Sequence, residues 1–175
     1  MFEILNPPEE LDCARAEVSQ AAIIRRGINK SERIINGMTA LRFECQPACT
    51  RCCEQQGFVY LTEDDLTRIA RFLGLDAREF ERRYVYRTRN LRRLRVPRHQ
   101  QCSFLREGGC SIHEVKPVQC RLFPFWPELV DGKESKREWK KTAQWCPGIG
   151  KGELVQIEAA RERASEMKRA YPSMY

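Results

Sequence analysis

The stretch Phe43-Glu-Cys-Gln-Pro-Ala-Cys-Thr-Arg-Cys-Cys53 holds four of the nine cysteines of the chain within nine residues. These four are Cys45, Cys49, Cys52 and Cys53. Four more follow at Cys102, Cys110, Cys120 and Cys146, and Cys13 stands alone near the start. Thiolates at this density, in a chain without a recognisable export signal, are typical of metal binding. The fold is therefore expected to form around sulfur ligands.

The composition of the chain indicates whether its cysteines bind metal or form disulfides. The chain has 175 residues, a net charge of +7, 42% hydrophobic and 31% charged residues, as expected for one soluble globular domain. The longest clean apolar stretch, Ala21–Ile24, is too short to cross a bilayer, and the acidic, proline-broken start is unlike a signal peptide. We therefore expect a cytoplasmic protein without a membrane partner. Structural disulfides are rare in that reducing compartment, and an odd number of cysteines also argues against a disulfide framework.

The pattern predicts an α+β fold, a small helix-rich single domain with short β-hairpins, stapled by cysteine-ligated metal. Within this domain over residues 1–175 we expect an N-terminal helical segment (1–40), a cysteine-cluster metal-binding core (41–150) and a C-terminal amphipathic helix (151–175). Apolar residues at helical spacing predict the first helix over 9–27. Thr62 followed by three acids predicts a helix start, and Asp76 predicts the start of the next short helix.

Two hairpins and a last helix are also predicted. Gly108-Gly109 indicates a hairpin turn, and Asp131-Gly132 indicates a second hairpin that continues toward Trp139. The glycines at 148–152 favour a turn before the last helix. Apolar residues from Leu154 to Tyr171 recur at steps of three and four, which predicts one amphipathic helix of about five turns.

The spacing of the cysteines leaves the number of metal centres open. Cys49 and Cys52 form a C-x-x-C pair that can reach one centre, whereas the adjacent Cys52 and Cys53 point too far apart to chelate one small ion. Eight thiolates match two four-ligand sites, a bridged binuclear site, or one cluster with spare thiols. His113, three residues after Cys110, is a ligand, a proton carrier or a structural residue, and Cys13 is most simply a buried apolar residue.

An arginine-rich segment is the second feature of the chain. Eight arginines and no acid lie between Arg82 and Arg98. Such a segment binds nucleic acid or another acidic partner, or else forms a solvated face whose arginine stems cover apolar surface. The interleaved Tyr84, Tyr86 and Leu94 favour a folded segment, and the solvated face is the simpler interpretation.

These residues resemble the YkgJ or CxxCxxCC family, cysteine-cluster proteins described as zinc- or iron-chelating. The resemblance runs from Phe43 to Gly148 and includes the blocks Cys102-Ser-Phe-Leu, Gly109-Cys-Ser-Ile-His-Glu-Val-Lys-Pro and Cys120-Arg-Leu-Phe-Pro-Phe. One departure is that three residues, not two, separate Cys45 from Cys49. The resemblance implies that the metal ligands are Cys45, Cys49, Cys52, Cys53, Cys102, Cys110, Cys120 and Cys146.

Three functions follow from these observations. The first is a metal-binding protein that holds an iron–sulfur cluster or zinc through its thiolates, with a redox role. The second is a structural zinc module that presents Arg82–Arg98 to RNA or another acidic partner. The third is a methyltransferase-type enzyme that uses S-adenosylmethionine, implied only by the family's relative, flagellin lysine N-methylase. The sequence holds no glycine-rich cofactor loop in favour of the third.

Overall fold

The computed structural model describes residues 39–99 and 101–175 of the chain. The described residues belong to one compact unit. Helices and short antiparallel strands make up the unit, which confirms the α+β class. The predicted first helix and Cys13 lie outside the described residues, so the single domain over residues 1–175 stays a prediction.

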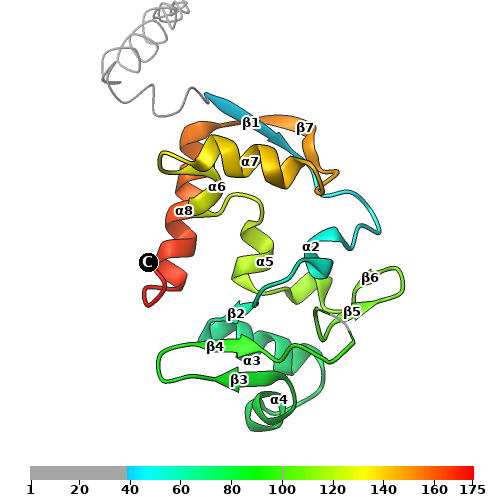
Figure 1. The fold of residues 1–175 in the computed structure, drawn as a ribbon. Coiled ribbons are helices and arrows are strands. Elements are labelled where there is room, and N and C mark those ends of the chain that lie inside the picture. The colour runs from blue at the N-terminus through cyan, green and yellow to red at the C-terminus, as the bar shows by residue number, and fades with distance from the viewer. Residues whose placement is uncertain (1–38, 100) are drawn as a thin grey trace, which may run out of the picture. The chain divides into compact units, whose positions relative to one another are not determined.

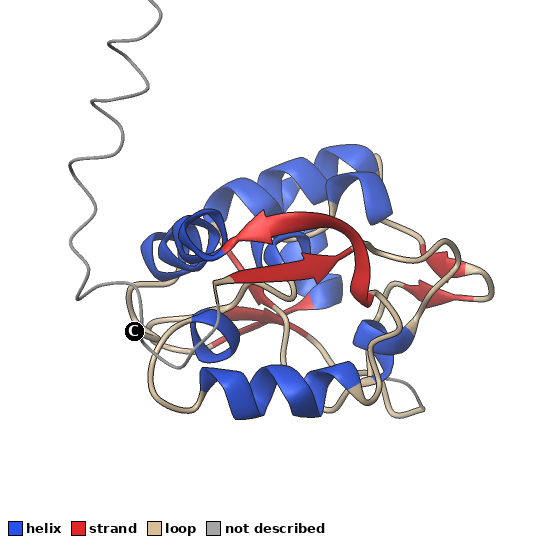
Figure 2. Cartoon of the chain, turned by 90° about the horizontal axis from the view of Figure 1, so that it is seen from above, coloured by secondary structure: helices blue, strands red, loops and turns tan. Residues whose placement is uncertain are grey.

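One part of the unit is built on a long two-stranded ribbon (Figure 1). In it β1 (Ala40–Phe43) pairs antiparallel with β7 (Ile149–Gln156), and β7 curves along β1 (Figure 2). The helices that pack on the ribbon and on one another are α6 (Pro127–Val130), α7 (Ser135–Ala143) and α8 (Ile157–Ala170). Their shared core includes Leu41, Phe125, Val130 and Ala160.

The other part is built on a three-stranded antiparallel sheet of order β2-β4-β3. The strands are β2 (Tyr60–Leu61), β3 (Val85–Arg87) and β4 (Arg92–Leu94), and the helices α3 (Glu63–Phe72) and α4 (Ala77–Tyr84) pack with them. Its core contains Leu61, Ile69, Phe80, Leu94 and Phe104.

The elements that carry most of the cysteines lie between these two parts (Figure 1). They are α2 (Arg51–Glu54), the hairpin of β5 (Leu105–Arg106) and β6 (Gly109–Cys110), a 3-10 turn at His113–Val115, and α5 (Val118–Leu122). The predicted cysteine loop therefore ends in a helical turn that holds Cys52 and Cys53. None of the helices within residues 39–99 and 101–175 combines the length and the apolar character needed to span a bilayer.

Both helix starts predicted from acidic side chains are confirmed. The Thr62 hydroxyl accepts a hydrogen bond from the Asp65 backbone N–H (3.0 Å), and the Asp65 carboxylate accepts one from the Thr62 N–H (3.1 Å). Asp76 caps α4 by accepting a hydrogen bond from the Glu79 N–H (2.8 Å). These caps satisfy N–H groups that have no partner within the helix, and they depend only on nearby sequence.

The predicted boundary of the last helix is wrong. The helix begins at Ile157, and residues 149–156 form β7 instead of a turn and the first helical turn. Leu154 is 52% exposed and pairs with Arg42 across the ribbon. The helical periodicity holds from Ile157 to Tyr171. The residues before Ile157 instead form a strand, because they pair with β1, which lies more than a hundred residues earlier in the sequence.

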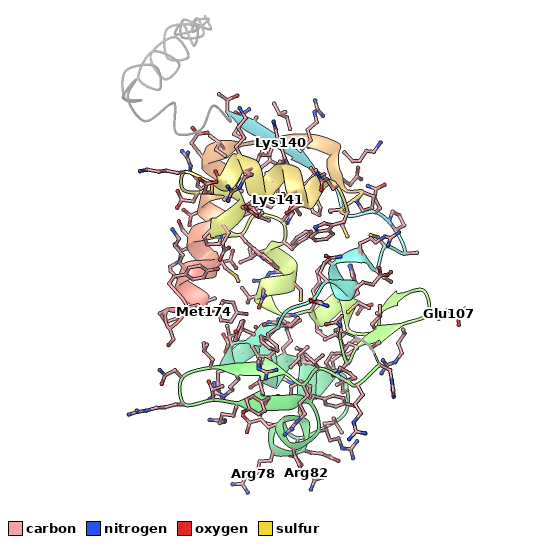
Figure 3. The ribbon with its side chains drawn as sticks, viewed as in Figure 1. Arg78, Arg82, Glu107, Lys140, Lys141 and Met174 are labelled. Atoms are coloured by element: carbon pink, nitrogen blue, oxygen red, sulfur yellow. The ribbon has the colours of Figure 1, made fainter. Side chains whose placement is uncertain are left out.

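Of the two predicted hairpins, one forms and one does not. The first turns at Glu107-Gly108, one residue earlier than predicted, because Arg106 pairs with Gly109; Glu107 lies at its tip (Figure 3). The second is wrong, since residues 127–143 form α6 and α7, joined at Asp131–Glu134. Pro127 in the first turn favours a helix because its fixed φ suits that position and its missing N–H is not needed there.

Candidate metal centre

A cavity of about 750 Å³ lies where the elements between the two parts meet. The predicted ligands that line it are Cys45, Cys49, Cys52, Cys53, Cys102, Cys110 and Cys120. Cys146 does not line it, although its neighbour Trp145 does. Residues up to 75 positions apart in the sequence therefore bring seven thiols to one cavity.

The first four cysteines reach the cavity through a loop and one helical turn. After β1 the chain turns at Ala48, whose φ of 55° is in the left-handed region, and the Cys49 N–H donates to the Gln46 carbonyl (3.2 Å). Cys52 and Cys53 then fall on α2, where the Cys53 N–H donates to the Thr50 carbonyl (2.8 Å). Adjacent residues of a helix are about 100° apart, so these two side chains approach the cavity from different directions.

The hairpin and α5 supply the next three cysteines. Cys110 lies on β6 opposite Leu105, whose N–H donates to the Cys102 carbonyl (3.2 Å), so Cys102 and Cys110 flank the same hairpin, as predicted. Cys120 lies on α5, and Pro117 precedes that helix as its N-cap residue.

A buried polar network fixes α5 and thereby Cys120. Asp65 is fully buried, pairs with Arg68 (2.6 Å) and accepts from the Val118 N–H (3.1 Å) at the start of α5. The Gln119 amide accepts from the Tyr60 N–H (2.7 Å) and donates to the Phe58 carbonyl (3.1 Å). The Tyr171 hydroxyl donates to the Tyr60 carbonyl (3.0 Å), which ties the end of α8 to β2. This network could not be predicted from local patterns, because its partners are far apart along the chain.

Four thiols interact directly at the centre of the cluster. Hydrogen bonding to Cys53 lowers the pKa of the Cys52, Cys102 and Cys110 thiols, and the same contacts raise the pKa of Cys53 well above its usual range. The four therefore titrate as a group, and the shifts favour the thiolate form of Cys52, Cys102 and Cys110. Readily formed thiolates are the form in which cysteine binds metal.

Burial favours the neutral form of three of the outer thiols, Cys45, Cys120 and Cys146. Burial raises the pKa of Cys45 and Cys146, and it raises that of Cys120 well above its usual range. The charge of Lys116 acts in the opposite direction on Cys45 and Cys120. Cys146 also interacts electrostatically with Cys49 and Cys52, which places it near the cluster although it is buried outside the cavity.

The thiols are gathered without being closed around a metal ion. Within the described residues, no three Cys, His, Asp or Glu side chains stand together in an arrangement that could hold a metal ion as it is.

The donor set fits a soft metal. The described residues that line the cavity include thiols, amides and aromatic rings but no carboxylate. Hard cations such as Ca²⁺ and Mg²⁺ prefer oxygen ligands, whereas thiolates favour zinc and iron–sulfur clusters. Phe123 contacts Trp126 and Trp145 (ring centroids 5.2 and 5.6 Å), and all three rings line the cavity.

His113 and Lys116 also line the cavity, and Lys116 was missed by the sequence analysis. The Nζ of Lys116 lies 3.3 Å from Nε2 of His113. Its position between Cys110 and Cys120, as the one lysine among the described cavity residues, is the feature that could have identified it. A cation there offsets the negative charge that accumulates when several thiolates share one site.

Four of the eight arginines in the segment pair with carboxylates of α3 and α4. Arg82 and Arg83 pair with Glu79, Arg87 pairs with Glu81, and Arg92 pairs with both Glu63 and Glu81. Arg82 projects from α4 into solvent (Figure 3). Half of the eight arginines therefore form ion pairs, which favours the solvated face over a binding surface for this part of the segment.

Comparison with known proteins agrees with the donor set. Residues 44–147 match the model of the CxxCxxCC family, described as a "putative zinc- or iron-chelating domain". No solved structure matches the chain significantly. The match begins beside Cys45 and ends just after Cys146, so it includes every predicted ligand. The chain therefore belongs to the CxxCxxCC family of zinc- or iron-chelating domains.

Proposed function

We propose that the cavity holds an iron–sulfur cluster with a redox role, ligated by thiolates from the set Cys45, Cys49, Cys52, Cys53, Cys102, Cys110, Cys120 and Cys146. The observation that carries the proposal is the gathering of seven of these residues around one cavity that has no carboxylate among its described lining residues. When bound, such a cluster supplies one-electron transfer, and the protein tunes its potential through burial and hydrogen bonds to the sulfurs.

The number and placement of the thiols support a polynuclear centre over a single zinc ion. One structural zinc ion takes four ligands in a tetrahedron with Zn–S distances of about 2.3 Å. Seven thiols around a cavity of about 750 Å³ exceed that capacity. The adjacent Cys52 and Cys53 both line the cavity, and such a pair suits two metal atoms of one centre better than one ion.

The surroundings also support a centre of high negative charge. Lys116 faces the thiols, and Phe123, Trp126 and Trp145 form an apolar wall beside them. The positive charge of Lys116 offsets the negative charge of the thiolates, and the aromatic wall limits the access of water to the metal site. Both are ways in which residues beyond the ligands determine the properties of a metal site.

The test is purification of the full chain without oxygen, followed by iron, zinc and acid-labile sulfide analysis. We expect iron and sulfide together, with a visible absorbance that is bleached by reductant. Zinc without sulfide would reject the cluster but retain a thiolate metal site, whereas protein without iron or zinc would reject both.

Serine substitutions test the ligand set. Cys53→Ser, at the centre of the interacting thiols, is expected to abolish loading, and Cys45→Ser and Cys120→Ser are expected to reduce it. Cys13→Ser is the matched control because Cys13 lies outside the family match. Loss of metal from Cys13→Ser alone would show that the ligand set is wrong.

The methyltransferase alternative rests only on the resemblance to flagellin lysine N-methylase. Equilibrium dialysis against labelled S-adenosylmethionine tests it, and absence of retained label would reject it. The second alternative, an acidic partner for the arginine segment, is favoured by a separate observation on the sheet.

A further inference from the structure

We propose that the exposed part of the β2-β4-β3 sheet around Phe58, Arg93 and Tyr86 binds single-stranded nucleic acid, with bases stacked on Phe58 and Tyr86 and the phosphates held by arginines. This activity goes beyond the metal centre, and it depends on a surface that sequence alone did not define.

The register of the sheet creates this surface. Tyr60, Arg93 and Tyr86 lie directly opposite one another on the three strands. The Leu94 N–H donates to the Val59 carbonyl (2.8 Å) and the Arg95 N–H to the Tyr84 carbonyl (2.7 Å), so pairing continues past the strand ends. Because side chains alternate between the faces, Phe58 and Arg95 share the face of Arg93. Leu61, Val85 and Leu94 are buried in the core beneath.

The centre of the face is a stacked group of three side chains. The Arg93 guanidinium carbon lies 3.9 Å from the centroid of the Phe58 ring and 4.5 Å from that of Tyr86. Phe58 is 47% exposed and Tyr86 is 46% exposed. Two large aromatic side chains therefore remain in water, held in place by an arginine, although burying them would be favourable. Exposed aromatic rings beside arginines on a small sheet are the arrangement on which unpaired bases stack.

The charge of the face is complementary to phosphate. The carboxylates near the sheet, Glu63, Glu79 and Glu81, are paired with Arg82, Arg83, Arg87 and Arg92. The exposed Arg89, Arg95 and Arg98 form no ion pair with any described residue. No acid lies between Arg82 and Arg98 in the sequence. An excess of positive charge therefore surrounds the aromatic rings, as in surfaces that follow a single strand.

Stacking distinguishes nucleic acid from other acidic partners. An acidic peptide would use the arginines but would gain little from the exposed rings. A duplex would present its phosphates but keep its bases stacked inside. The combination of half-exposed aromatic rings with arginines that pair with no described carboxylate fits single strands best.

The test is fluorescence anisotropy with the full, metal-loaded chain and labelled oligouridine and oligothymidine of about ten nucleotides. We expect binding that weakens with salt, and competition by unlabelled single strands but not by a duplex of equal length or by polyglutamate. Tighter binding of the RNA would assign a contact to the 2′-hydroxyl, and equal binding would assign recognition to base and phosphate alone.

Variants separate stacking from charge. Tyr86→Ala is expected to weaken binding about tenfold, whereas Tyr86→Phe retains it. Arg93→Lys keeps the charge but removes the planar stack, so it should also weaken binding. Arg82→Ala removes one positive charge from α4 and is the control that should bind as the parent does. Tyr86 is used because Phe58 also lines the metal cavity.

Two results would overturn the proposal. One is absence of binding by the loaded chain at low salt. The other is binding that Tyr86→Ala and Arg93→Lys leave unchanged while polyglutamate or duplex competes, because the surface would then act by charge alone. Metal content and circular dichroism of each variant show that the fold and the centre are retained.

Discussion

Replacing Gly148 by alanine probes how closely the two cysteine-bearing ends of the family match are held together. Gly148 follows Cys146 by two residues, and its carbonyl accepts from the Glu44 N–H (3.1 Å) just before Cys45. A Cβ at position 148 would lie 2.5 Å from the Glu44 carbonyl oxygen and 2.9 Å from Cε2 of Phe43. Because the closer atom belongs to the backbone, a rotamer change cannot relieve the clash, and the two segments must move apart.

The magnitude follows from three contributions. Overpacking costs about 1–3 kcal/mol, and weakening the Glu44–Gly148 hydrogen bond costs about 0.5–1.5 kcal/mol. The reduced entropy of the unfolded chain offsets about 0.4–1 kcal/mol. The free energy of unfolding should therefore fall by about 2 kcal/mol, which lowers Tm by about 4–8 °C for a chain of this size.

The assay combines thermal unfolding with metal analysis. Gly150→Ala is the matched control, since a Cβ there meets no atom within 4 Å but its φ of +87° strains any other residue. It should cost about 1–2 kcal/mol through backbone strain without separating Cys45 from Cys146, so only Gly148→Ala should lose metal. A Tm within about 1 °C of the parent for Gly148→Ala, or equal metal loss in both variants, would refute the reasoning.

Three further predictions concern stability and the metal. Tyr171→Phe removes the hydroxyl that donates to the Tyr60 carbonyl and should lower the free energy of unfolding by about 1–3 kcal/mol; an unchanged urea midpoint would show that this bond contributes nothing. Ile157→Ala, in the core, should lower the free energy of unfolding by about 2–5 kcal/mol, whereas Leu154→Ala, on the exposed face of β7, should leave it nearly unchanged. A larger loss for Leu154→Ala than for Ile157→Ala would support a helix that begins near Leu154. A strong chelator should lower Tm and raise hydrogen exchange first in residues 44–54, because metal binding is coupled to folding; equal acceleration in α8 would mean that the metal stabilises the whole unit alike.

Local chemistry allowed some elements to be predicted. Thr62 and Asp76 cap their helices through hydrogen bonds that span three residues, so neighbouring sequence was sufficient. Prediction failed where contacts between residues far apart in the sequence determine the secondary structure. The residues of β7 were expected to form a turn and then the start of the last helix, and α6 and α7 were expected to form a hairpin. In both places short apolar and glycine patterns fit more than one conformation, and contacts elsewhere in the fold select between them.

The sequence by itself determined the chemistry of this protein, because the identity and order of its cysteines define a soft donor set and the family to which the chain belongs. Only the tertiary structure decided which groups meet. It brings seven thiols and Lys116 to one cavity, leaves Cys146 beside it, and pairs half of the arginines with carboxylates while Arg93 stacks between Phe58 and Tyr86. The physical reason is that ligand type is a property of single side chains, whereas a cavity or a stacked surface depends on distances between residues that only long-range packing sets.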